Sequence, residues 1–307
     1  MAYLFTHFTS GEGGDREQIW FSVSSDGLHW KDLGKDGEPV LASEVGTKGI
    51  RDPFIVYDER LKKYFIIGTD LNTSSWDWDA FASRGSRSLL VWESEDLINW
   101  SEVRLCEVGI EGAGCVWAPE AVFCEERNAW FVFWASNVKE KPFEKRKQRI
   151  YGAFTEDFAT FTPTFKFMDE KTGIIDTNIV RCDGWYYRTS KDETNKTLIF
   201  ERCRKLIPDE ENAYERISSP VLDGFFGLEG PEVYYLRDMG KWCLMADQYH
   251  GNKGYLPMLT DDLSSGDFET LSSDKYDLGA RKKRHGGIME IPDELAQMLE
   301  EELGVIE

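Results

Sequence analysis

The sequence lacks any long apolar run. No segment holds about 18 or more uncharged apolar residues, the length that a helix needs to cross a bilayer. Residues 1–8 are too short, and lack the basic start, for a secretory signal. We therefore expect no membrane partner and a cytoplasmic location, although a trimmed chain would show the same start. The six cysteines include no Cys-x-x-Cys pair, which predicts free thiols rather than a disulfide framework or a metal site.

Basic residues are also scarce. Lys and Arg number 36 against 56 Asp and Glu, which gives a formal net charge of -20. Such a charge argues against nucleic acid or an anionic membrane as a partner, and it suits a neutral ligand. The one basic cluster, residues 139–149, is predicted to be a solvated loop. Helical signals are equally sparse, and we expect a helix only in the C-terminal tail, at about residues 292–303, which begins with Pro292.

What the sequence does contain is a repeat. Five short segments begin with a polar residue at the start of a predicted strand, and the steps between these residues are 68, 56, 53 and 56. A period of this size predicts an all-β, five-bladed β-propeller that forms a single domain over residues 1–307. Equivalent points of a propeller meet at its axis, so the repeat also predicts a site there. The five leading residues are Asp52, Glu120, Asp176, Glu229 and His285.

Further signals agree with this repeat. Each of the first four leading segments is followed by a polar turn and an aromatic-rich run, such as residues 130–134, which together indicate an antiparallel hairpin. A second motif, an acidic turn followed by an aromatic residue, recurs in the predicted outer part of the blades at residues 25–30, 95–100 and 156–161, with a weaker copy at 261–268. The last leading segment lies near the C-terminus. We therefore expect residues 3–5 to complete the blade that contains residues 288–290.

The predicted cluster of carboxylates suits hydrolysis of a glycosidic bond. That reaction needs one protonated carboxyl group to assist the leaving oxygen and one carboxylate to activate water or attack the sugar. Asp52 is followed by proline, and Glu229 by glycine and proline. Either motif alone is more simply a strand-entry turn. Their shared position in the repeat favours the catalytic interpretation.

Four motifs follow one another in the chain: Arg51-Asp52-Pro53-Phe54-Ile55, Trp117-Ala118-Pro119-Glu120, Ile175-Asp176-Thr177-Asn178 and Glu229-Gly230-Pro231. Their order resembles glycoside hydrolase family 43, and the resemblance extends from Tyr3 to about Ile291. It implies a five-bladed propeller that acts on arabinose-, xylose- or galactofuranose-containing glycans with inversion. It also implies that Asp52 is the general base, that Asp176 tunes and orients the acid, and that Glu229 is the general acid.

The remaining site residues are predicted to contact substrate. Glu120 departs from the family, where this motif more often ends in aspartate, and we interpret it as a substrate or loop-anchoring contact. His285 is either a hydrogen-bonded core residue or a contact of a central water network or calcium ion. No cofactor is required, and no loop of EF-hand type supplies calcium ligands. The predicted substrate-binding residues are Arg51, Trp76, Trp117, Glu120, Asn178, Arg284 and His285.

The sequence leaves the sugar open. Residues 85–92 and 284–286 resemble those of a subgroup that acts on furanosides, which favours an exo-acting α-L-arabinofuranosidase or β-D-galactofuranosidase. A β-xylosidase of the same family is the main alternative. A glycoside phosphorylase would need a cluster of cations for phosphate, and only Arg51, Arg284 and His285 are candidates. A non-catalytic glycan-binding propeller is disfavoured because all three carboxylates are present.

Overall fold

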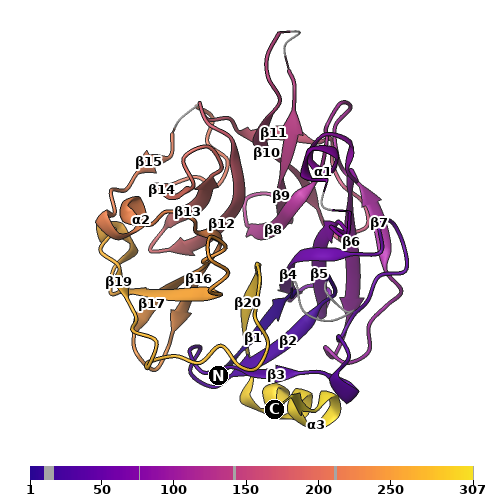
Figure 1. Ribbon diagram of the computed structural model, residues 1–307, viewed down its shortest axis with the longest axis vertical. Coiled ribbons are helices and arrows are strands. Elements are labelled where there is room, and N and C mark those ends of the chain that lie inside the picture. The colour runs from indigo at the N-terminus through magenta and orange to yellow at the C-terminus, as the bar shows by residue number, and fades with distance from the viewer. Residues whose placement is uncertain (10–16, 76, 141–142, 211–212, 307) are drawn as a thin grey trace.

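The structure is a computed structural model that describes residues 1–9, 17–75, 77–140, 143–210 and 213–306. These residues form five antiparallel sheets arranged as blades around an axis (Figure 1). The predicted five-bladed propeller is confirmed. The first blade comprises β4 (Ile50–Asp58), β5 (Lys63–Asp70), β6 (Ser88–Ser94) and β7 (Arg104–Glu107), and the second comprises β8 (Trp117–Cys124), β9 (Ala129–Val138), β10 (Lys147–Thr155) and β11 (Phe165–Met168). The third comprises β12 (Ile174–Cys182), β13 (Trp185–Asp192), β14 (Thr197–Cys203) and β15 (Glu215–Arg216), and the fourth comprises β16 (Glu229–Leu236), β17 (Lys241–Asp247), β18 (Tyr255–Thr260) and β19 (Glu269–Thr270). The fifth comprises β20 (Gly286–Ile291), β1 (Ala2–His7), β2 (Trp20–Ser24), β3 (Lys31–Leu33) and β21 (Val305–Ile306).

The fifth blade joins the two ends of the chain. Strand β1 pairs with β20 in antiparallel register, with Tyr3 opposite Glu290 and Phe5 opposite Ile288. This confirms the predicted closure by the N-terminal segment. Because β1 is hydrogen-bonded to β20 on one side and to β2 on the other, the ring is closed by backbone hydrogen bonds within a single sheet.

Hydrophobic side chains fill the spaces between blades, where the two faces of each sheet meet their neighbours. One such layer joins the first two blades through Phe65, Trp130 and Phe158. The acidic turns of the outer motif recur as predicted. Asp26, Asp96 and Asp157 each accept backbone N–H groups two and three residues later, which fixes the connection between the third and fourth strands.

Two expectations from the sequence are wrong. The described residues contain three α-helices rather than the tail alone: α1 (Trp78–Arg84), α2 (Pro220–Gly224) and α3 (Asp293–Leu303), besides two short 3₁₀ turns. Helices α1 and α2 are short and lack a periodic apolar stripe, but each begins at a capping side chain, Asp77 or Ser219. The basic segment 139–149 is not all loop, because Arg149 lies in β10, is buried, and pairs with Glu144 and Asp169.

The six cysteines are all free, as expected. Among the residues that the structure describes, no helix is both long and apolar enough to span a membrane.

Candidate active site

The innermost strands of four blades share one local distortion. Each contains a β-bulge near its first residues, and each bulge holds a residue with positive φ: Asp52 (50°), Ala118 (47°), Asp176 (49°) and Gly230 (53°). A bulge interrupts the ladder and re-aims the side chains beside it. The four bulges surround the propeller axis, so they direct side chains toward one another there (Figure 1).

This register corrects the predicted equivalence of the leading residues. Asp52 and Asp176 occupy the bulge position, but Glu229 lies one residue before Gly230, and Glu120 lies two residues after Ala118. The repeat therefore places the acidic groups at three successive levels of the innermost strands rather than at one point. Each bulge spans two residues, so the offset arises because the acidic residues occupy different positions relative to the bulge, and strand propensity does not locate a bulge.

Asp52 is held between two blades. Its Oδ2 accepts a hydrogen bond of 2.9 Å from the Thr69 hydroxyl, and that hydroxyl in turn accepts the Ala118 N–H at 2.8 Å. Its Oδ1 lies 3.5 Å from His285 Nδ1. Burial would raise the pKa of Asp52, but the contact with His285, its charge and the charge of Arg51 outweigh burial and hold this pKa below 3.8. Asp52 is therefore ionised at neutral pH.

The pKa of Asp176 shifts in the opposite direction to that of Asp52. Burial raises its pKa to about 6, and repulsion from Glu229 and Asp52 adds to the rise, against the attraction of His285 and Lys191. Its Oδ2 accepts the Gly230 N–H at 3.1 Å, which ties it to the strand that carries Glu229.

Glu229 lies between two cations. Its Oε2 is 2.7 Å from Lys191 Nζ, and its Oε1 is 2.9 Å from Arg284 Nη2. Burial opposes ionisation, but the charges of Lys191 and Arg284 prevail and lower the pKa of Glu229. Arg284 also pairs with Asp247, and Lys191 with Glu193 at 2.8 Å.

His285 stands at the centre of this group. Besides Asp52, it lies 3.9 Å from Asp176 Oδ1 and 3.9 Å from Glu120 Oε1. Contacts with Asp52 and Glu120, together with the charges of Asp176 and Asp52, outweigh burial and raise the pKa of His285 well above 6.5, so the imidazole is cationic at neutral pH. Gly230 makes this position available, since a Cβ there would lie 2.6 Å from the ring carbon Cγ of His285.

Beneath His285 a second polar layer is fully buried. The Asn178 amide donates to Glu120 Oε2 at 3.0 Å and to Glu232 Oε2 at 3.4 Å. Burial raises the pKa of Glu120 to about 7, and it raises the pKa of Glu232 well above its ordinary value. Glu120 and Asn178, both predicted to contact substrate, bond to each other here, and a direct substrate contact stays a prediction for both.

The arrangement of His285 and the carboxylates at the axis does not favour a central calcium ion. Calcium prefers six to eight oxygen ligands, whereas a protonated imidazole lies between the carboxylates of this site. Among the described residues, no group of three or more His, Cys, Asp or Glu is arranged to hold a metal ion.

Three supporting residues were missed in the sequence. Thr69, Lys191 and Asp247 occupy the same level of the second strand in three blades, opposite Arg51, Ile175 and Glu229 respectively. Each bonds a charged side chain of the site. The signal that could have found them is a polar residue at or next to the end of each buried second strand.

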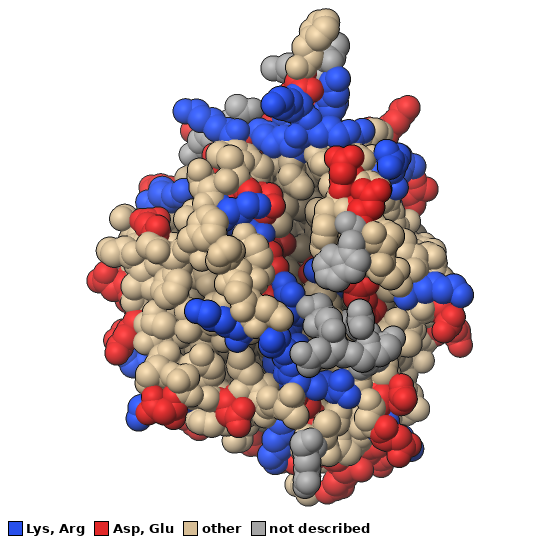
Figure 2. Space-filling view, viewed as in Figure 1, with Lys and Arg blue, Asp and Glu red and all other residues tan. Residues whose placement is uncertain are grey.

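The remaining predicted contacts lie at the edge of the site. Arg51 pairs with Glu17 at 3.0 Å and stacks on Phe8, and Trp117 is half-buried with its ring edge against Trp78. Trp76 lies outside the described residues. Figure 2 shows that this face of the molecule is hollowed at its centre, with acidic and basic atoms inside the hollow.

Comparison with known proteins agrees with this geometry. A family model described as a probable glycosyl hydrolase domain, of the family 43-related type, matches residues 1–296. A curated α-L-arabinofuranosidase from Bifidobacterium longum subsp. longum is 28% identical in an alignment of length 287 that covers 80% of this chain and 26% of that protein. The chain thus spans about a quarter of the length of this relative.

Solved structures share the fold. An exo-β-1,3-galactanase from Clostridium thermocellum superposes with a TM-score of 0.61 at 12% identity, over 95% of this chain and 63% of that one. A family 62 α-L-arabinofuranosidase from Coprinopsis cinerea gives a TM-score of 0.54 at 13% identity, over 80% and 73% of the two chains. At these identities the likeness concerns the fold alone. The match over residues 1–296 establishes more: this chain belongs to the family of probable glycosyl hydrolase domains related to family 43.

Proposed function

We propose that the protein is an inverting exo-glycosidase that releases a terminal furanosyl sugar from a glycan. Asp52 is the general base, Glu229 the general acid and Asp176 the residue that controls the acid's proton. The observation that carries this proposal is the difference in environment among three buried carboxylates that converge on one axis. Neighbouring cations lower the pKa of Asp52 and of Glu229, whereas burial and repulsion from these two carboxylates raise the pKa of Asp176 to about 6.

The base assignment rests on the contacts of Asp52. Its low pKa keeps it ionised, and the Thr69 hydroxyl and the His285 imidazolium fix its orientation. An ionised, oriented carboxylate can accept a proton from an attacking water. In the inverting mechanism that water lies between the base and the sugar, which requires the two catalytic carboxyl groups to be about 6.5–9.5 Å apart.

The acid assignment needs a proton on Glu229, and its two cations disfavour that proton in the free protein. Asp176 can hold the proton that Glu229 needs. Burial and repulsion from Glu229 raise the pKa of Asp176 to about 6, and strongly interacting carboxyl groups share their protons as a pair. We infer that this proton is on Glu229 when a glycosidic oxygen occupies the site, because burial beneath substrate favours the neutral acid.

The choice of sugar rests on the relative. The curated protein is named an α-L-arabinofuranosidase, and we therefore propose α-L-arabinofuranose first and β-D-galactofuranose second. A phosphorylase reaction is disfavoured because Arg51 and Arg284, its candidate phosphate ligands, are both engaged with carboxylates.

A panel of 4-nitrophenyl glycosides tests the proposal. The purified protein should release nitrophenol from the α-L-arabinofuranoside or the β-D-galactofuranoside in preference to the β-D-xylopyranoside. Asp52→Asn protein, prepared in the same way, is the control for contaminating activity. Preferential cleavage of the xyloside, or equal rates for both proteins, would contradict the proposal.

A further inference from the structure

A sizeable cavity lies away from the catalytic carboxylates. Its volume is about 920 Å³, and it lies between the outermost strand of the second blade, β11, and strands β13 to β15 of the third. Pockets that bind small ligands commonly measure about 300–1,000 Å³. None of Asp52, Asp176, Glu229 and His285 lines it.

Strand β13 separates the two sites. Side chains alternate across a strand, and on β13 Arg188 and Asp192 line the cavity, whereas Lys191 reaches Glu229. The cavity therefore lies on the face of the third blade that packs against the second blade, and the acid lies toward the fourth.

The cavity has a polar floor that is already ordered. Arg188 donates from Nε and Nη2 to Glu201 Oε2 at 3.1 and 2.8 Å, and both residues are buried. The guanidinium lies 3.9 Å from the centre of the Tyr214 ring, which holds it in place. Arg188 Nη1 and Glu201 Oε1 have no hydrogen-bond partner among the described residues. The lining thus offers one donor and one acceptor on an ordered ion pair, and sugar hydroxyls both accept and donate.

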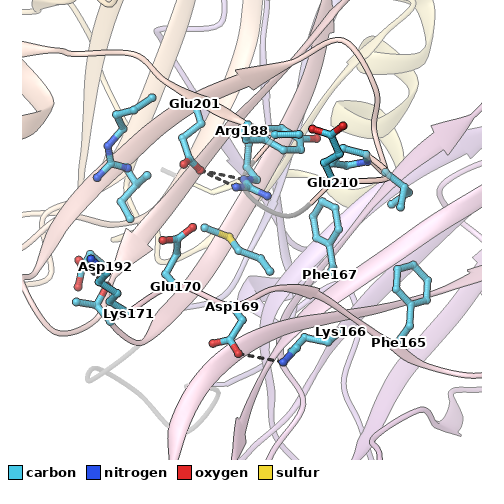
Figure 3. A pocket seen from close by; sticks show the side chains of 18 of the residues that line it. Phe165, Lys166, Phe167, Asp169, Glu170, Lys171, Arg188, Asp192, Glu201 and Glu210 are labelled. Atoms are coloured by element: carbon cyan, nitrogen blue, oxygen red, sulfur yellow. Dashed lines mark hydrogen bonds and ion pairs between the residues drawn. The ribbon is translucent and has the colours of Figure 1, made fainter.

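One wall is aromatic. Phe165 and Phe167 project from β11 on the same side, and both pack on the core ring of Phe131 (Figure 3). Glu170 also lines the cavity and has no side-chain hydrogen bond or ion pair among the described residues, and burial together with repulsion from Glu201 raises its pKa. Aromatic rings beside rigid polar groups form the amphipathic surface that suits the apolar and hydroxyl faces of a sugar ring.

The charge of the lining narrows the ligand class. Four basic and six acidic side chains line the cavity, so it offers no excess of cations for a phosphate or a uronate. We propose that this cavity is a second binding site for a neutral oligosaccharide, which anchors a distant part of the glycan while the axial site cleaves its end. The choice of glycan as ligand rests on the proposed function, whereas the site itself rests on the cavity.

The test fills the cavity without disturbing its buried ion pair. Ala213→Trp places a large ring in the lining, and Ala159→Trp, at an exposed turn outside the lining, is the matched control. Both are made in the Asp52→Asn protein, and binding of arabinohexaose, galactohexaose and xylohexaose is followed by calorimetry. We expect at least one of these sugars to bind, and Ala213→Trp to weaken that binding by about tenfold or more, with Ala159→Trp unchanged.

Kinetics with Asp52 intact give a second readout. Ala213→Trp should lower kcat/KM on a polymeric glycan by about tenfold, because the anchored segment no longer raises the local concentration of chain ends, and should leave the aryl glycoside rate unchanged. The inference is overturned if no neutral oligosaccharide binds, if Ala213→Trp has no effect on binding, if the polymer and aryl rates fall together, or if oligogalacturonate binds more tightly. If Ala213→Trp weakens oligosaccharide binding but the native protein cleaves no aryl glycoside, the proposed function alone is contradicted.

Discussion

Replacing Thr69 with valine tests how the site is coupled to the fold. The change keeps the shape of the side chain but removes a hydroxyl that donates to Asp52 and accepts the buried Ala118 N–H. A hydrogen bond to a charged group contributes about 1.5–3 kcal/mol, and a buried N–H left unpaired costs about 1–3 kcal/mol. The two effects share one hydroxyl, so we expect the free energy of unfolding to fall by about 2–5 kcal/mol. That is a large part of the ~5–15 kcal/mol typical of a domain.

Thr189→Val is the matched control. Thr189 is fully buried on β13, but its hydroxyl has no hydrogen-bond partner among the described residues, so its removal should be neutral or stabilising. Urea unfolding measures both, and the midpoint should fall only for Thr69→Val, with the m-value unchanged. The pKa of Asp52 should also rise in Thr69→Val, so the acidic limb of the rate profile should move to higher pH. Equal losses of stability in the two variants would refute the reasoning.

Four further predictions concern the chemistry. Asp52→Asn and Glu229→Gln should each lower kcat/KM by about 10²–10⁴-fold, and Glu229→Gln should spare aryl substrates whose leaving group needs little protonation; near-native rates on a glycan would contradict both roles. In the native protein, kcat/KM should fall as pH rises through about 6, because the acid must carry the proton that the Asp176–Glu229 pair loses there; Asp176→Asn should abolish this limb. Lys191→Met removes the nearer of the two cations beside Glu229, so it should raise the pKa of Glu229 and move the alkaline limb of the rate profile to higher pH. The control Lys196→Met loses only a more exposed contact with Glu193 and should leave this limb in place. Proton NMR of the first-formed product should show an anomeric configuration opposite to that of the substrate, and retention would exclude the inverting mechanism.

The sequence predicts the propeller well because each blade has local signals. Aromatic hairpins and acidic turns such as that at Asp96 recur within about 60 residues, and local hydrogen bonds produce them. The site is harder to predict because its contacts join distant strands. Glu17 reaches Arg51 across 34 positions, and Lys191 reaches Glu229 across 38. No local pattern encodes which polar residue faces which, so the supporting side chains stay invisible until the blades are packed.

Contacts between distant strands stabilise the strained bulges and position the proposed base. A non-glycine residue with positive φ is strained, and aspartate tolerates that conformation better than most residues. Asp52 and Asp176 therefore serve both the bend and the chemistry, and Gly230 accepts the same conformation without strain. Ala118 has neither advantage. Its bulge is stabilised instead by the hydrogen bond from its N–H to Thr69, the residue that also orients Asp52. One hydroxyl thus joins the strained backbone of the second blade to the proposed base of the first, so the packing between blades sets the position of the base.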